Sequence, residues 1–241
     1  MGADAVSGGR ARLAIGVLAR APLAGACKTR LIPLIGAPGA ARLQRHLIER
    51  TLDTACAAAP GAVTLFTAGE APDAPWLGWQ QRFGVRLLPQ VGADLGERMR
   101  RALAALLGQA QQALLIGTDC PLLEAHHLQA AARRLARARM VFVPAKDGGY
   151  VLVGAREPNA EVFRGIAWST AHVMRQTRDA LRACGWRRGR DWAELPALWD
   201  IDRPADLRRA IGAGLVPTEL FGSPEPGLSR PEPCSRELCD A

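Results

Sequence analysis

The lysines are the first residues of this chain that suggest chemistry. Of its 31 basic residues only two are lysines, Lys28 and Lys146, and each lies in a loop that follows an apolar run. Arg20 and Arg30 share the first of these loops with Lys28. Such a loop, leading from a strand into a helix, offers backbone N–H groups and basic side chains that can neutralise a di- or triphosphate. It lacks the Walker pattern, and a merely solvated basic loop is the alternative.

Acidic residues at the ends of apolar runs indicate a hard cation. Asp119 follows the run 113–117. A carboxylate just beyond a buried strand is well placed to hold Mg²⁺ or Mn²⁺ against phosphate oxygens. Asp200 and Asp202 precede a helix that we expect to begin at Pro204, and one of them could reach the same metal. Helix capping is the alternative in both places.

Two glycine-containing motifs would let the backbone come close to a ligand. In the first, Gly96 and Arg98 follow Asp94 at the expected start of a helix, where Asp94 is well placed as the N-cap. Arg98 would face an anion or a carboxylate, although capping alone explains this motif equally well. The second is a turn, formed by Asp147, Gly148, Gly149 and Tyr150. A simple hairpin turn is its alternative.

The elements that must position these residues alternate between strand and helix, which predicts an α/β fold with a single doubly wound, mostly parallel sheet flanked by helices. Strands are predicted at 13–18, 63–68, 85–89, 113–117, 141–145 and 151–154, and helices at 37–58, 95–111, 124–138, 170–184 and 204–213. The link between the last two strands is too short for a crossover helix, so one of them is predicted to be antiparallel.

Composition predicts one domain and excludes several classes of protein. Residues 12–215 are predicted to form the domain, 1–11 an N-terminal tail and 216–241 a Pro-rich disordered tail. No apolar run approaches the ~20 residues of a membrane helix, and no signal peptide is recognisable. The six cysteines form no Cys-x-x-Cys pair, which favours reduced thiols and a cytoplasmic protein. The net charge is +8, but aromatic residues are not interleaved with the basic residues. We therefore expect neither nucleic acid nor membrane as a partner.

Taken together and in this order, the motifs resemble the DUF2064 family of bacterial nucleotide-sugar transferases with the glycosyltransferase-A fold, many of which are assigned to arsenosugar biosynthesis. The resemblance covers about 13–213. The first loop is also similar to that of 2-phospholactate guanylyltransferases. The segments that carry the resemblance are Lys28 to Leu31, Asp94 to Met99, Gly117 to Pro121, Asp147 to Tyr150, Trp168 to Thr170 and Asp200 to Asp202.

The resemblance implies roles for these residues. Asp119 would be the strand-end metal ligand and Asp202 the distal one, with Mg²⁺ or Mn²⁺ between them. Asp147 would be a sugar ligand or the acceptor-side base. The residues expected to bind substrate are Arg20, Lys28, Arg30, Asp94, Gly96, Arg98, Gly148, Gly149, Tyr150, Trp168 and Ser169. Folds of this kind usually carry an Asp-x-Asp motif, whereas here Cys120 and Pro121 follow Asp119.

The leading expectation is a metal-dependent glycosyltransferase that moves a sugar from a nucleotide sugar to a small-molecule acceptor. Asp119 and Lys28 would both stabilise the departing diphosphate. The first alternative is nucleotidyl transfer from an NTP with release of pyrophosphate, since three basic residues in one loop exceed what a diphosphate needs. The second is a non-catalytic nucleotide- or nucleic-acid-binding protein, in which Asp119 and Asp202 would be dispensable. The nucleobase, the acceptor and the oligomeric state stay open at this point.

Overall fold

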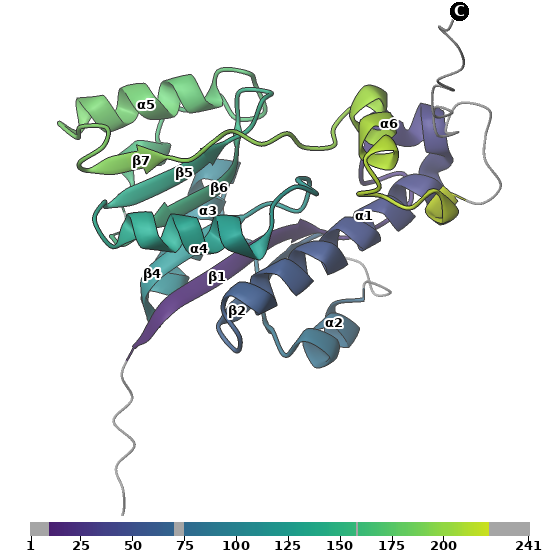
Figure 1. Ribbon diagram of the computed structural model, residues 1–241, viewed down its shortest axis with the longest axis horizontal. Helices are drawn as coiled ribbons and strands as arrows, with labels where there is room; N and C mark the ends of the chain where they lie inside the picture. Colours follow the sequence, from purple (N-terminus) through teal and green to yellow (C-terminus); the bar gives the residue numbers. More distant parts are fainter. Residues whose placement is uncertain (1–9, 70–74, 158, 222–241) are drawn as a thin grey trace, which may run out of the picture.

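The computed structural model describes residues 10–69, 75–157 and 159–221, which form an α/β structure around a seven-stranded sheet of order β3-β2-β1-β4-β6-β5-β7 (Figure 1). The strands are β1 (Ala11–Arg20), β2 (Val63–Ala68), β3 (Arg86–Pro89), β4 (Ala110–Ile116), β5 (Met140–Pro144), β6 (Tyr150–Ala155) and β7 (Trp192–Glu194). Only β6 runs against its neighbours, pairing antiparallel with β4 and β5. The predicted fold class and the predicted antiparallel strand are therefore confirmed.

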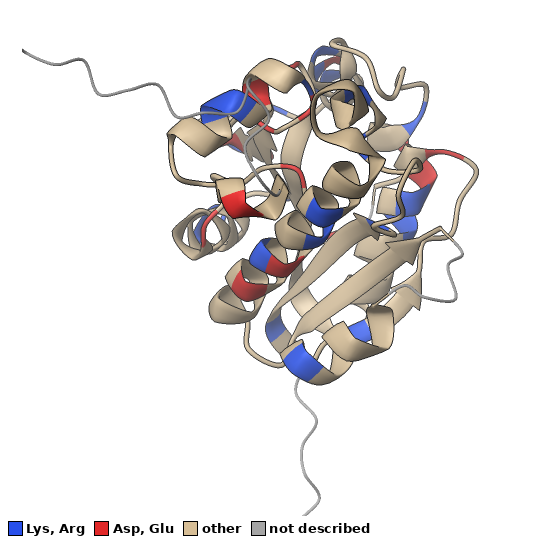
Figure 2. Cartoon of the chain, turned by 90° about the vertical axis from the view of Figure 1, so that its right-hand side faces the viewer, with Lys and Arg blue, Asp and Glu red and all other residues tan. Residues whose placement is uncertain are grey.

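Helices cover both faces of the sheet. They are α1 (Ile32–Ala58), α2 (Trp76–Phe83), α3 (Leu95–Leu107), α4 (Ala125–Leu135), α5 (Val173–Ala183) and α6 (Pro204–Gly212), with short 3₁₀ helices at Thr29–Leu31, Glu161–Phe163 and Thr218–Phe221. One core cluster joins the sheet to α1, α2 and α4, and a second joins it to α3 and α5. Strands covered on both faces must be continuously apolar, which explains their sequences. In Figure 2 most charged residues lie on helices and loops, and the strands carry few of them.

A third, smaller core lies beside the sheet. It packs the first half of α1 against α6 and against the segment around Trp199 and Ile201, which are 7% and 0% exposed. In Figure 1, α6 lies next to the N-terminal part of α1, away from the strands. The small core therefore anchors the stretch of chain that carries Asp200.

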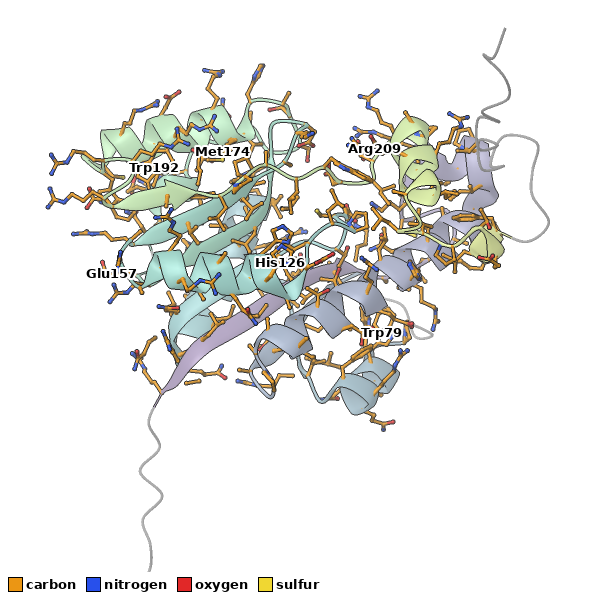
Figure 3. All side chains as sticks on the ribbon, in the orientation of Figure 1. Trp79, His126, Glu157, Met174, Trp192 and Arg209 are labelled. Carbon is orange, nitrogen blue, oxygen red and sulfur yellow. The ribbon has the colours of Figure 1, made fainter. Side chains whose placement is uncertain are left out.

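The predicted element ends differ from the observed ones where tertiary contacts decide them. The predicted helix 95–111 ends at Leu107, because Ala110 already pairs with Ala11 in the sheet. The prediction missed β7 and α2, which are only three and eight residues long. A packing residue of α2 is Trp79, which lies between α1 and α2 in Figure 3 and donates a hydrogen bond to Glu49 at 2.9 Å.

Both predicted domain boundaries require correction by a few residues. Ala11 belongs to β1 rather than to a tail. Val216 is 1% exposed and packs in the third core, and Arg42 of α1 donates a hydrogen bond to the Leu220 carbonyl. The residues that pack in the small core thus extend at least to Phe221. The rest of both predicted tails, 1–9 and 222–241, lies outside the described residues. Within the described ranges, no helix combines the length and the apolarity needed to cross a membrane.

Candidate active site

The loops after β1 and β4 bring Lys28 and Asp119 together, because these two parallel strands are neighbours in the sheet. Lys28 Nζ lies 2.8 Å from Asp119 Oδ1 and donates a hydrogen bond of 2.6 Å to the Ile201 carbonyl. The lysine side chain is only 6% exposed. Its backbone is left-handed (φ 48°, ψ 39°), a conformation that costs free energy in a residue other than glycine and persists only where the surroundings hold it. Lys28 therefore ties together three segments of the chain.

The Asp119 carboxylate is held by one oxygen. Oδ1 receives both the Lys28 ammonium and the Thr118 hydroxyl, whose oxygen is 3.3 Å away. The Asp119 side chain is nevertheless 51% exposed, and both of these interactions with described residues use Oδ1. The structure thus presents one carboxylate oxygen at the edge of the sheet where open α/β folds bind their ligands.

Asp200 adds a second carboxylate to this edge. Its neighbour Ile201 donates a backbone hydrogen bond of 2.8 Å to the Asp119 carbonyl. Burial and the negative charges of Asp147 and Asp119 raise the pKa of Asp200 to about 6. These three acids, from three loops, therefore share one electrostatic environment.

Asp202, the acid that the family resemblance selects, forms an ion pair with Arg30 instead. Both side chains are largely exposed, at 44% and 61%. The sequence pattern left Asp200 and Asp202 as alternatives. The signal that separates the two acids is a pair of large apolar residues, Trp199 and Ile201, on either side of Asp200. Their burial draws the acid between them toward the sheet.

This donor set fits a divalent cation that is bound partly by its substrate. In the described part of the chain, no group of three or more Asp, Glu, His or Cys side chains is spaced to enclose a metal. Mg²⁺, however, is usually bound by one or two carboxylates together with phosphate oxygens. The half-exposed carboxylate of Asp119 and the partly buried carboxylate of Asp200 meet that requirement.

A cavity of about 510 Å³ opens at the carboxyl ends of β1, β2 and β3, and neither Lys28 nor Asp119 lines it. Its size is that of a pocket for a small ligand. Gln90 forms part of the wall and donates hydrogen bonds to the carbonyls of Ala19, at 3.1 Å, and Phe66, at 2.9 Å. The side chains that line the cavity are those of Arg20, Ala21, Leu23, Ala26, Thr67, Ala68, Pro89, Gln90 and Arg98, with the Gly69 backbone.

Comparison with protein families places this chain. The model described as "Uncharacterized protein conserved in bacteria (DUF2064)" matches residues 51–170. The chain belongs to the DUF2064 family. The matched part includes the motifs around Asp94, Asp119 and Asp147, and the resemblance predicted from the motifs is confirmed. No curated protein matches the chain.

Solved structures similar to this DUF2064 protein share its fold. A protein from Desulfovibrio desulfuricans G20, provisionally named a nucleotide-diphospho-sugar transferase, is 27% identical, with a TM-score of 0.74 over 87% of this chain and 90% of that one. A nucleotidyl transferase from Methanothermobacter is 15% identical, with a TM-score of 0.55 over 82% and 95%. A 4-diphosphocytidyl-2C-methyl-D-erythritol synthase from Anaerococcus prevotii is 12% identical, with a TM-score of 0.54 over 80% and 92%. The last two show the fold alone.

Two of the family motifs meet in packing contacts. Asp94 accepts a hydrogen bond of 2.8 Å from the Glu97 amide, so the predicted N-cap is confirmed. A side chain on Gly96 would lie 2.6 Å from the ring of Trp168, and only glycine therefore fits there. Arg98 donates to the Gly92 carbonyl at 3.1 Å and also lines the cavity. In this motif, Arg98 is the residue that the structure brings to the pocket.

The turn before β6 is held by α5. The Gly148 backbone is left-handed (φ 98°), and a Cβ there would lie 2.2 Å from the Ala171 carbonyl oxygen. The Gly148 carbonyl accepts a hydrogen bond of 2.8 Å from Met174. Asp147 accepts a hydrogen bond of 2.9 Å from the Gly149 amide and stays exposed. The glycines therefore shape the turn, and Asp147 is the member that faces solvent at the site.

Tyr150, expected to bind substrate, points into the protein. Its hydroxyl is buried close to the Thr177 side chain, and burial raises its pKa. Its ring packs edge-on against Phe142 and Trp168. The next residue of the Trp168 motif, Ser169, is exposed and has a left-handed backbone (φ 65°). Tyr150 and Trp168 thus pack together on the inner side of the turn.

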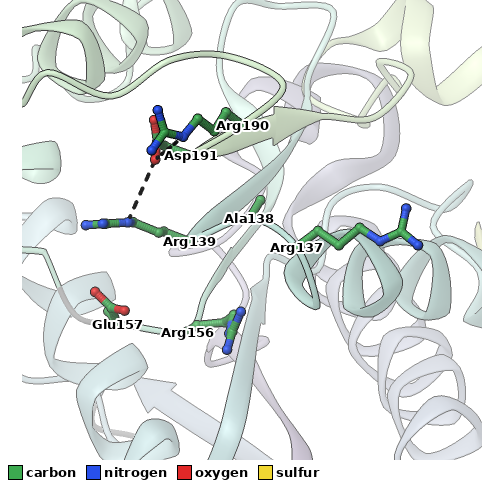
Figure 4. Close-up of a pocket in the computed structure, with 7 residues that line it drawn as sticks. All are labelled: Arg137, Ala138, Arg139, Arg156, Glu157, Arg190 and Asp191. Atoms are coloured by element: carbon green, nitrogen blue, oxygen red, sulfur yellow. Dashed lines mark ion pairs between the residues drawn. The ribbon is translucent and has the colours of Figure 1, made fainter.

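A second hollow, of about 270 Å³, lies at the opposite edge of the sheet, where β5 and β7 begin and β6 ends (Figure 4). Asp191 lies 3.9 Å from Arg139 and 4.0 Å from Arg190, and the Arg137 side chain points away from the others in Figure 4. No family motif reaches this hollow. Its lining residues are Arg137, Ala138, Arg139, Arg156, Glu157, Arg190 and Asp191.

Proposed function

We propose that this DUF2064 protein is a glycosyltransferase that moves a sugar from a nucleotide sugar to a small acceptor. The observation that carries the proposal is the relative position of two features at the carboxyl end of β1. The cavity lies toward β2 and β3, and the Lys28–Asp119 pair lies toward β4. β2 and β3 follow β1 on one side of it and β4 lies on the other, so the site occupies the point where strand order reverses. Open α/β sheets bind nucleotides at that point. The similarity to the Desulfovibrio protein supports the same class of donor.

In this proposal the nucleoside occupies the cavity and its phosphates extend past β1 toward Asp119. Arg20 and Arg98 line the cavity and would contact the phosphates or the base. Lys28 would stabilise negative charge on the departing diphosphate from a fixed, almost buried position. Because Lys28 is held by Asp119 and Ile201, it needs little reorganisation as charge develops.

Asp119 would hold a divalent cation, Mg²⁺ or Mn²⁺, together with either Asp200 or Asp202. When bound, the cation would neutralise charge on the diphosphate. Asp202 would become available only if Arg30 left it for a phosphate, whereas Asp200 already shares its surroundings with Asp119. Asp147, exposed beside them, is the proposed base that takes the proton of the acceptor hydroxyl.

Nucleotidyl transfer is the second candidate, and one observation favours it. Arg20 is the last residue of β1, and Lys28 and Arg30 lie between β1 and α1; this concentration of positive charge suits a triphosphate. An incoming phosphate would then attack the α-phosphorus of an NTP and release pyrophosphate. Asp119 and Lys28 would keep the same electrostatic roles.

A thermal-shift panel separates the two candidates. NTPs and the matching nucleotide sugars would be compared with and without Mn²⁺, because a ligand that binds only the folded state must stabilise it, by about 2.7 kcal/mol at 100 times its Kd. Greater stabilisation by a nucleotide sugar than by its NTP supports glycosyl transfer, and the reverse supports nucleotidyl transfer. Release of a nucleoside diphosphate or of pyrophosphate during turnover then decides between them. A protein that no nucleotide stabilises would contradict both.

A further inference from the structure

A buried glutamine links the two loops that carry the proposed site. Gln44 of α1 is 4% exposed, and its Nε2 lies 3.4 Å from the Arg20 carbonyl and 3.4 Å from the Thr118 hydroxyl. Its neighbours on α1, Leu43 and Leu47, are buried as well, at 0% and 1% exposed. Burying an amide costs free energy unless it is hydrogen-bonded, so these two contacts offset the cost of burying the Gln44 side chain.

The chemistry of the partners sets the direction of these hydrogen bonds. A backbone carbonyl such as that of Arg20 can only accept, so the amide nitrogen of Gln44 must face it. The same nitrogen donates to Thr118 Oγ1. The single hydrogen of the Thr118 hydroxyl is then left for Asp119 Oδ1, 3.3 Å away. The chain of donors therefore runs from Gln44 through Thr118 to the Asp119 carboxylate.

We propose that Thr118 and Gln44 are positioning residues for the cation ligand Asp119. Thr118 and the Lys28 ammonium both interact with Oδ1, and Oδ2 would then be the oxygen that binds the metal. The assignment rests on the proposed function, because it needs Asp119 to be a metal ligand. An exposed carboxylate that is not held would rotate, and a ligand fixed by an outer hydrogen bond binds its metal more tightly.

The test is Mn²⁺ binding to the full chain, measured from the electron paramagnetic resonance signal of free Mn²⁺, both without nucleotide and with a nucleoside diphosphate whose oxygens would complete the site. Thr118→Val removes the hydroxyl and keeps the shape, and it is expected to weaken Mn²⁺ binding roughly 10-fold, the lower end of the loss for an outer-shell partner. Thr118→Ser keeps the hydroxyl and should restore binding to within about twofold. Gln44→Met should weaken binding in the same direction but less, since it acts through Thr118.

The matched control is Thr51→Val in α1. It also removes a buried threonine hydroxyl, which donates to the Leu47 carbonyl at 2.8 Å. It should leave Mn²⁺ binding unchanged. If Asp119→Asn loses Mn²⁺ while Thr118→Val keeps it, the positioning role is overturned and the metal ligand stands. If the parent protein binds no Mn²⁺, the cation site and this inference fail together, whereas nucleotide binding in the thermal-shift panel still tests the proposed donor.

Discussion

The two arginine-lined hollows at opposite edges of the sheet differ in what surrounds the arginines. The cavity at the carboxyl ends of β1, β2 and β3 has Arg20 and Arg98 in its wall and lies beside the Lys28–Asp119 pair. The hollow at the other edge has four arginines, with Glu157 and Asp191 among them, and contains neither a lysine nor a family motif. Its arginines extend from strand ends into solvent, and Asp191 partly compensates their charge.

This difference shows that the number of arginines does not define an anion site in this chain. The almost buried lysine, its left-handed backbone and the carboxylates around it are restricted to one edge. At that edge, parallel strands deliver several loops to one place.

The largest effect is expected from Asp119→Asn. The amide keeps the shape of the carboxylate and loses its charge, so divalent-dependent turnover should fall on the order of 100-fold or more. The melting temperature should fall while the protein stays folded, because the variant leaves the almost buried Lys28 ammonium without its carboxylate partner. Turnover with and without Mn²⁺, together with thermal unfolding, measures both effects. Full activity in this variant would remove Asp119 from the mechanism.

Lys28→Met should weaken nucleotide binding more than Arg30→Ala. A charge-assisted contact contributes roughly 1.5–3 kcal/mol, and Lys28 is fixed, whereas Arg30 is 61% exposed and paired with Asp202. Isothermal titration with a nucleotide diphosphate gives the two dissociation constants. Equal affinity of Lys28→Met and the parent would contradict the phosphate role of the loop.

Comparing Asp200→Asn with Asp202→Asn identifies the second acid of the site. If Asp200 completes the cation site, its variant should lose more divalent-dependent activity than the Asp202 variant. The opposite order would favour Asp202, released from Arg30 when substrate binds. The activation of turnover by Mn²⁺, titrated for both variants, is the deciding measurement.

Asp200→Asn should also stabilise the free protein at neutral pH. The pKa of Asp200 is raised from its ordinary 3.8 to about 6, so folding disfavours the charged form. Its unfavourable contribution is absent below about pH 4 and complete above about pH 6. The free energy of unfolding of Asp200→Asn, relative to the parent, should therefore increase across this range. Denaturant unfolding at pH 4 and pH 7 would show it, and a constant difference would contradict the raised pKa.

The smallest effect is expected at the other edge. Arg139→Ala with Arg156→Ala should leave nucleotide binding unchanged and alter the free energy of unfolding by no more than about 1 kcal/mol, since exposed ion pairs contribute little. The Arg139 guanidinium also lies over the Trp186 ring, 5.3 Å from its centre, and this contact is the main one lost. A clear loss of nucleotide affinity in this double variant would end the distinction between the two edges.

The sequence by itself determined the architecture and the outline of the site. Largely apolar runs located the strands, and Val63–Ala68 matches its predicted bounds, because a strand covered on both faces is apolar at most of its positions. The very short turn after Pro144 was enough to predict an antiparallel pair. The motifs also pointed to Lys28 and Asp119, which the strand order then brought to 2.8 Å.

Only the tertiary structure decided which residues of each motif face the site. Lys28 and Ile201 are 173 positions apart, and no local pattern reports such a contact. The burial of Trp199 and Ile201 separates Asp200 from Asp202, and the packing of Tyr150 against Phe142 turns a predicted substrate residue inward. No sequence pattern predicted the role of Gln44, because in the sequence it is simply one polar residue within a helix. Periodicity reports how much of a segment is buried, whereas a site depends on which segments meet.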